Sequence, residues 1–184
     1  SVDEIVERVE RELKRVLDEV REIHDRARDE LRRMHERSER IIRKVEEELE
    51  RALKEVRDRG VPREVLKRIE EIVKRVKDKL RELLKRSKEL VERIERENRE
   101  VLRKIEETAR KVEEELERLR REGVDDKVVR EAVREVERVV TELLEESRRS
   151  VEKTERLVRR SEELIRKIVK EVKKVAREIR EEVR

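Results

Sequence analysis

The sequence predicts an all-α fold: a single-chain, up-down-up three-helix bundle of long, nearly straight antiparallel helices. Three observations support this prediction. The only two glycines, Gly60 and Gly123, divide the 184 residues into three segments of similar length. In each segment one apolar stripe repeats about every 3.6 residues, the period of a straight α-helix. Almost all other positions are charged, since Asp, Glu, Lys and Arg make up 59% of the chain.

The first helix is expected to span about residues 2–59. Ser1 is followed three residues later by a glutamate, which is the pattern of a capping box at a helix start. Gly60 suits the position just after a helix end, where the backbone turns left-handed. Between these signals the apolar stripe runs from Val2 to Val56.

The second and third helices are expected at about residues 62–122 and 125–183. Pro62 is predicted in the first turn of the second helix, and an aspartate of the Asp125-Asp126 pair is predicted to cap the third. The loops are then residues 60–61 and 123–124, and loops this short require antiparallel neighbours. Residues 1–184 are therefore predicted to form one domain. Two residues that lie level with each other on the first and second helices then have numbers that add up to about 121. Two residues that lie level on the second and third helices have numbers that add up to about 247.

Composition argues against several classes of partner. The 56 basic and 52 acidic residues are interleaved and leave a net charge of +4, which favours solvated helix faces over a nucleic-acid surface. The chain has no aromatic residue on which a base could stack and no cysteine. No apolar run exceeds two residues, so we expect no membrane span and no signal peptide. We expect no nucleic-acid partner, no membrane partner and no cofactor, and the cellular location is not indicated.

Neutral polar side chains are rare and fall close to the apolar stripes, to which random surface variation would not confine them. In the expected register they gather into two buried hydrogen-bond layers. The first predicted layer is His24, Asn98, Ser147 and Ser150. The second predicted layer is His35, Ser38, Ser87 and Ser161. Thr108 and Thr154 are expected to bond back to carbonyl groups of their own helices.

The sequence argues against a metal site and against catalysis at these residues. Zinc needs three or four ligands, and each layer offers one histidine and no cysteine, so no metal site is predicted. A Ser–His nucleophile needs an orienting carboxylate and an oxyanion hole, and unbroken helices have no spare backbone N–H groups, so we predict no catalytic residues and no enzyme. Two simpler alternatives stay open: the histidines, His35 above all, could be exposed, and Asn98 could serve only to specify register.

The chain resembles de novo designed helical bundles with buried hydrogen-bond networks, some of which respond to pH. The resemblance covers all 184 residues. It lies in the equal helix lengths, the Gly-Val-Pro and Gly-Val-Asp loops, the Glu/Lys/Arg/Asp surface, the Val/Leu/Ile core and the segregated Ser, Asn and His. Such designs are often oligomers of helical hairpins with several histidines in a layer, whereas this chain has one in each. A natural spectrin-like repeat is a weaker match, because those repeats are shorter and usually carry a core tryptophan.

The resemblance implies a designed scaffold without natural biochemical activity, in which buried histidines could couple stability to pH. A buried neutral histidine should have a pKa below its ordinary value of about 6.5, so its contribution to stability would be lost as the pH falls. No partner is required, because one chain can bury its own stripes, and a monomer is expected. The alternative is a helical binding or self-assembly module that accepts an extra helix or forms an oligomer or filament.

Overall fold

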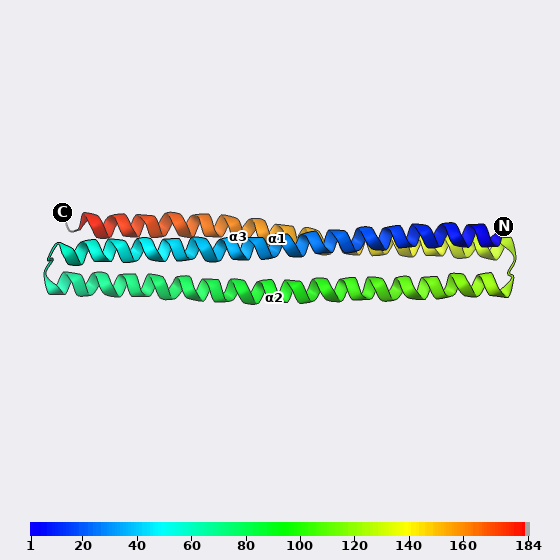
Figure 1. Cartoon of the computed structure of the whole chain (residues 1–184), viewed down its shortest axis with the longest axis horizontal. Coiled ribbons are helices and arrows are strands. Elements are labelled where there is room, and N and C mark those ends of the chain that lie inside the picture. Colours follow the sequence, from blue (N-terminus) through cyan, green and yellow to red (C-terminus); the bar gives the residue numbers. More distant parts are fainter. Residues whose placement is uncertain (183–184) are drawn as a thin grey trace. The chain divides into compact units, whose positions relative to one another are not determined.

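The computed structural model describes residues 1–182, and these residues form three α-helices (Figure 1). Helix α1 spans Val2–Asp58, α2 spans Arg63–Glu122 and α3 spans Asp126–Glu181. No strand occurs among residues 1–182, so the predicted three-helix bundle is confirmed. The predicted end of the third helix at residue 183 lies outside the described residues. Within the described range, none of the helices is apolar enough over a sufficient length to cross a bilayer.

Both predicted N-terminal caps are present. The Oγ atom of Ser1 accepts a hydrogen bond from the backbone N–H of Glu4 at 3.4 Å, and the Ser1 carbonyl accepts the N–H of Ile5 at 3.2 Å. At the start of α3, Asp125 Oδ1 accepts the backbone N–H of Lys127 at 3.4 Å. These side chains satisfy N–H groups that have no partner within the helix.

The two loops use glycine as predicted. Gly60 has φ of 70° and Gly123 has φ of 62°, in the left-handed region that glycine adopts without a steric penalty. Pro62 was predicted to be the first residue of α2, but it precedes the helix by one position. Its carbonyl accepts the N–H groups of Val65 and Leu66, both at 3.0 Å, so Pro62 is the N-cap and α2 begins one residue later.

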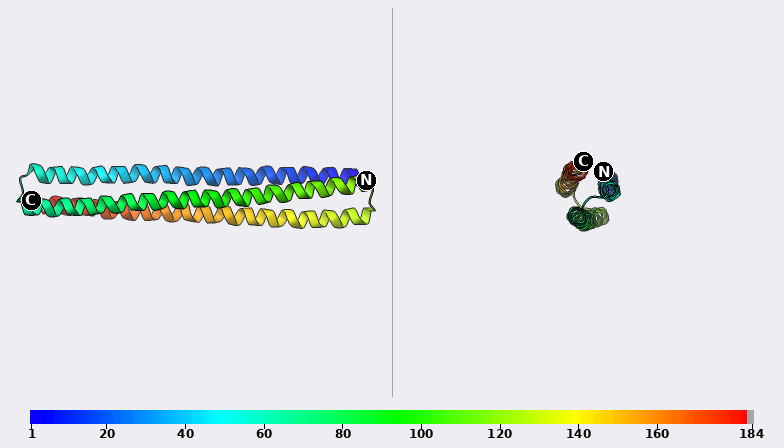
Figure 2. Two further views of the ribbon diagram at one scale, coloured as in Figure 1. Left: turned by 90° about the horizontal axis from the view of Figure 1, so that it is seen from below. Right: turned by 90° about the vertical axis from the view of Figure 1, so that its left-hand side faces the viewer.

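The described chain divides into two compact units. Unit 1 consists of Ser1–Asp29 and Ile94–Glu155, and unit 2 consists of Glu30–Arg93 and the chain from Arg156 on. Each unit contains one segment of every helix, and Figure 2 shows the three segments of each unit as neighbours. The single domain predicted for residues 1–184 stays a prediction.

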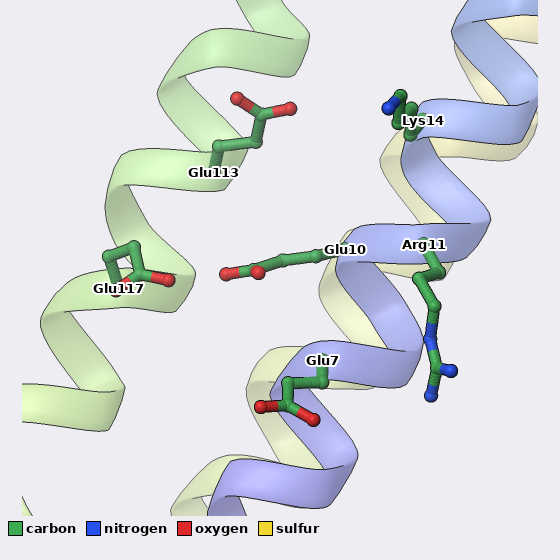
Figure 3. A pocket seen from close by; sticks show the side chains of 6 residues that line it. All are labelled: Glu7, Glu10, Arg11, Lys14, Glu113 and Glu117. Carbon is green, nitrogen blue, oxygen red and sulfur yellow. The ribbon is translucent and has the colours of Figure 1, made fainter.

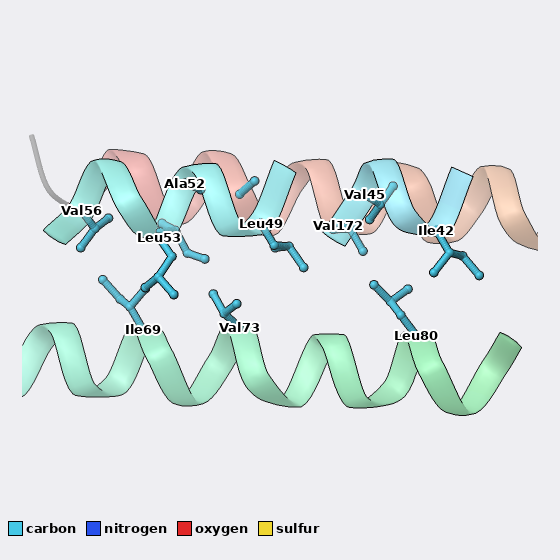
Figure 4. Close-up of a cluster of buried hydrophobic side chains, with 12 residues drawn as sticks. Ile42, Val45, Leu49, Ala52, Leu53, Val56, Ile69, Val73, Leu80 and Val172 are labelled. Carbon is cyan, nitrogen blue, oxygen red and sulfur yellow. The ribbon is translucent and has the colours of Figure 1, made fainter. Parts of the chain in front are cut away.

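The apolar stripes are buried in both units. Unit 1 has two core clusters, which are Val6, Val9, Leu116, Val129, Val133 and Val136, and then Leu13, Leu17, Val20, Ile105, Ala109 and Leu143. Unit 2 has one larger cluster, in which α1 residues such as Leu49 and Leu53 face Ile69 and Val73 of α2 (Figure 4). In the apolar pairs Ile5-Val6, Val16-Leu17 and Ile41-Ile42 of α1, the second residue is buried and the first is half-buried.

Ion pairs between α1 and α2 show the direction and register of these helices. In unit 1, Arg21 bonds Glu106 at 2.9 Å. In unit 2, Arg57 bonds Glu70 at 3.4 Å and Lys77 pairs with Glu50. Residue numbers rise in α1 as they fall in α2, so the two helices are antiparallel in each unit. The paired numbers sum to about 127 rather than the predicted 121, because side chains lean toward the N-terminus of their own helix.

Helices α1 and α3 run parallel within each unit. In unit 2, Arg180 bonds Glu48 and Glu55, both at 2.7 Å, and Arg37 bonds Glu162 at 3.3 Å. The Arg180 guanidinium holds the pKa of the Glu48 carboxyl below its ordinary value. In parallel helices the side chains lean the same way, so their pairing stays close to the predicted level.

Candidate functional site: buried polar clusters in the core

His24 lies in the core of unit 1. Its Nε2 atom is 2.9 Å from Ser147 Oγ on α3, and the relative exposures of the two residues are 4% and 1%. The second ring nitrogen, Nδ1, is also buried and has no hydrogen-bond partner. The histidine is therefore only half satisfied, because a neutral imidazole has one donor and one acceptor nitrogen.

Burial lowers the pKa of His24 from its ordinary value of 6.5. Protonation would place a charge in the core and would make both ring nitrogens donors, although Nδ1 has no acceptor. The neighbouring Asp25 carboxylate raises the pKa and so opposes this effect, but it is the smaller of the two influences. The structure therefore favours a neutral imidazole bonded to Ser147.

Asn98 of α2 uses both ends of its amide on α3. Its Nδ2 atom donates to Thr154 Oγ1 at 3.0 Å, and its Oδ1 atom accepts from Ser150 Oγ at 2.6 Å. Thr154 also donates to the backbone carbonyl of Ser150 at 3.2 Å, which closes a ring of three residues. Asn98 and Thr154 are buried. Each of these bonds satisfies a polar group that would be costly to leave unpaired in the core.

The predicted first layer is thus divided into two clusters. No hydrogen bond in the described chain joins His24 to Asn98 or Ser150; the hydrogen bond of His24 to another helix goes to Ser147 on α3. The lean of the side chains explains the correction. His24 and Asn98 are level in the predicted register, but on antiparallel helices they lean in opposite directions and miss each other.

The lean of the side chains also explains why Thr154 is a partner of Asn98, which the sequence did not predict. The predicted bond of Thr154 to its own helix is present, as it donates to the Ser150 carbonyl, and Thr154 also accepts from Asn98. Thr154 lies one turn beyond Ser150, the residue level with Asn98 in the predicted register, which is where an antiparallel lean directs the amide. Thr108, predicted to bond back as well, has no such bond among the described residues.

The predicted second layer, in unit 2, does not form as a network. His35 Nε2 is 2.9 Å from Glu39 Oε1, one turn along the same helix, and its Nδ1 atom is buried without a partner. Ser38 is buried and donates to the backbone carbonyl of Met34 at 2.8 Å. Over residues 1–182, neither Ser87 nor Ser161 makes a hydrogen bond to His35. Local partners on α1 replace the predicted partners on α2 and α3.

One carboxyl group of unit 1, that of Glu10, lies in an unfavourable electrostatic environment that the sequence did not indicate. Glu10 points from α1 toward Glu117 on α2, in a pocket that Glu113 also lines (Figure 3). Its Oε1 atom is buried and unpaired. Burial raises the pKa of Glu10, and the neighbouring Glu117 raises it further. The signal in the sequence was weak, because Glu10 looks like any other charged position beside a stripe.

The described residues offer no group of three or more His, Cys, Asp or Glu side chains arranged to hold a metal ion. Comparison with known protein families, with curated proteins and with solved structures finds no match to this chain. What the structure itself establishes is a three-helix bundle with buried hydrogen bonds among His, Ser, Asn and Thr side chains.

Asn98→Ala should destabilise the protein by about 1–3 kcal/mol, because Ser150 loses its acceptor within the core. Urea denaturation measures the loss. A double-mutant cycle with Ser150→Ala should give a coupling of at least about 0.5 kcal/mol, since the two side chains bond directly. Strictly additive losses would show that the pair contributes nothing as a pair.

Glu10→Gln should stabilise the protein at pH 7, by no more than about 1 kcal/mol because the carboxyl is partly exposed and water screens its charge. Because the pKa of folded Glu10 is raised above the ordinary value of 4.5, its contribution to stability is present below pH 4.5 and is lost as the pH rises through the folded pKa. The gain should therefore shrink at pH 4. Glu12→Gln, an exposed position on the same helix, is the control; an equal gain there would contradict the account.

Proposed function

We propose that the protein is a designed structural scaffold whose buried polar groups specify helix pairing and make its stability depend on pH. One observation supports this most directly: His24 is buried, bonded through Nε2 to Ser147, and left unpaired at Nδ1. A core built only of Val, Leu and Ile tolerates sliding of one helix along another, whereas hydrogen bonds are directional and favour one register. Protonation of His24 would disturb that arrangement.

Several features support a structural role for the His24–Ser147 pair over a catalytic one. The 2.9 Å separation suits a nucleophile and its base, but both residues are buried, so a substrate has no route to Ser147. The Nδ1 atom has no partner, so no carboxylate orients the ring. The helical N–H groups around it already serve the helix, so they are not free to stabilise an oxyanion.

The pH dependence follows from the direction of the pKa shift. The unfolded chain should bind a proton at His24 near pH 6.5, while the folded chain resists it until a lower pH. The contribution of His24 is therefore fully present above 6.5 and is lost as the pH falls through the folded pKa. Asp25 is the one charged group that raises the pKa of His24 and so opposes the effect of burial. In the described chain, no charged side chain of α2 or α3 contributes to this pKa shift.

We propose that the protein is a monomer. Apolar stripes are buried between helices within each unit, and in the described chain the exposed large apolar residues are Ile72, Val128 and Leu164 alone. Multi-angle light scattering should give the mass of one chain, 22.6 kDa. A concentration-independent multiple of that mass would favour the alternative, a self-assembling helical module.

The stability of the unmodified protein should fall between pH 7.5 and pH 5.5 by up to about 1.4 kcal/mol more than that of His24→Leu. The reason is that leucine keeps the apolar bulk but binds no proton. Urea denaturation of both proteins at both pH values gives the difference directly, and the comparison cancels the titration of carboxyl groups that the two proteins share.

His35→Leu provides the matched control, because it removes the other histidine of the chain and keeps His24. The part of the pH dependence that comes from His24 should survive in His35→Leu and vanish in His24→Leu. Equal pH dependence of stability in the unmodified protein and in His24→Leu would contradict the proposed role of His24 and leave a scaffold whose stability does not depend on His24 protonation.

A further inference from the structure

The serines of the predicted second layer have a different setting from those of the first. In unit 2 they line an open pocket of about 240 Å³ between α2 and α3 that reaches α1. Ser38 comes from α1, Ser87 from α2 and Ser161 from α3. The walls of the pocket are apolar and consist of Ile42, Leu83, Leu84, Leu90, Leu164, Ile165 and Ile168. Three helices therefore place one hydroxyl each at an apolar pocket.

Two of the three hydroxyls are free to bind something else. Ser38 donates to the carbonyl of Met34 at 2.8 Å, so its proton is already used. Ser87 and Ser161 are half-buried and make no hydrogen bond within residues 1–182. The serines of unit 1 differ, because Ser147 meets His24 and Ser150 meets Asn98. In unit 2 no such partner fills the space between the serines.

The pocket also exposes apolar surface that a ligand would cover. Leu164, on its wall, is 51% exposed, more than Ile72 or Val128. Arg86 is the only charged residue of the lining, and its guanidinium already bonds Glu82 at 2.8 Å. An apolar lining with a few convergent hydroxyls and no free charge is the usual composition of a site for a small neutral molecule.

We propose that this pocket binds a small, neutral, ring-shaped molecule that carries one hydroxyl or carbonyl group. The leucine and isoleucine side chains bury the rings, while Ser87 and Ser161 hydrogen-bond the polar group. The volume is below the roughly 300–1,000 Å³ of sites for drug-sized ligands, so it suits a molecule of one or two fused rings. This binding site is independent of the proposed pH-dependent scaffold, which rests on His24 in unit 1.

The test uses 2-naphthol as the probe and the full chain as the protein. The chain contains no Phe, Tyr or Trp, so all fluorescence comes from the probe. Titration with protein should change the naphthol emission with saturation, with a dissociation constant on the order of 1 mM or below, as expected for a ligand of about eleven heavy atoms. Naphthalene, which lacks the hydroxyl, should bind more weakly.

Variants distinguish this pocket from general adsorption. Ser161→Leu and Ser87→Leu each fill the pocket and should abolish binding, while Thr141→Leu on an exposed part of α3 should not. Ser87→Ala with Ser161→Ala should weaken 2-naphthol binding roughly 5–10-fold, as expected for a lost hydrogen bond, and leave naphthalene unchanged. Urea denaturation verifies that each variant is folded.

Three results would overturn the proposal. The first is the absence of saturable binding up to the solubility limit of 2-naphthol. The second is binding that persists in both folded leucine variants, which would place the probe elsewhere. The third is an equal loss of 2-naphthol and naphthalene binding in the double alanine variant, which would remove the serines from recognition.

Discussion

A polar side chain in the core of this bundle must find its hydrogen-bond partner on its own helix or on one of two neighbours. The cost of leaving a buried polar group unpaired is about 1–3 kcal/mol, comparable to a substantial part of the net stability of a small domain. In unit 1 the partners lie across helices, because His24 Nε2 bonds Ser147 and Asn98 bonds Ser150 and Thr154. In unit 2 they lie along one helix, because Ser38 bonds Met34 and His35 Nε2 pairs with Glu39. The Nδ1 atom of each histidine stays unpaired.

The difference matters for what each cluster can do. A bond from one helix to another changes when the helices slide, so the Asn98 and His24 bonds favour one pairing of α3 with its neighbours. A bond along one helix, such as that of Ser38, is unaffected by sliding and specifies nothing about the partner helix. The directional information in this core is therefore concentrated in unit 1, and the serines left unpaired in unit 2 line a pocket instead.

Much of the fold could be predicted because it depends on local signals. Ser1, Asp125, Gly60 and Gly123 act within a few residues of their own position, and the apolar stripe needs only the period of the helix. The partners of the polar residues could not be predicted as well. They depend on where side-chain tips lie, and in antiparallel helices the tips are displaced from the level of their backbones by about one turn. This displacement separated His24 from Asn98 and brought Thr154 to Asn98.

Two of the side chains with an unpaired atom, His24 and Glu10, have opposite effects on how stability depends on pH. Protonation of His24 favours the unfolded chain and so lowers the stability of the folded protein. Protonation of Glu10 removes an unfavourable charge from the folded protein and so raises its stability. Burial lowers the pKa of His24 and raises the pKa of Glu10, so each shift disfavours the charged form. Acid therefore weakens the core of unit 1 at His24, and protonation of Glu10 offsets part of this loss.

The account depends most on the neutral, buried state of His24, and a ¹⁵N NMR titration of the histidine rings observes that state directly. The chain has only two histidines, and His35→Leu assigns the signals without ambiguity. In the folded protein the His24 ring should titrate with a pKa below 6.5 and should show one nitrogen in a hydrogen bond. A His24 pKa at or above 6.5 would contradict the account, because it would mean that the folded core accepts the charged imidazolium.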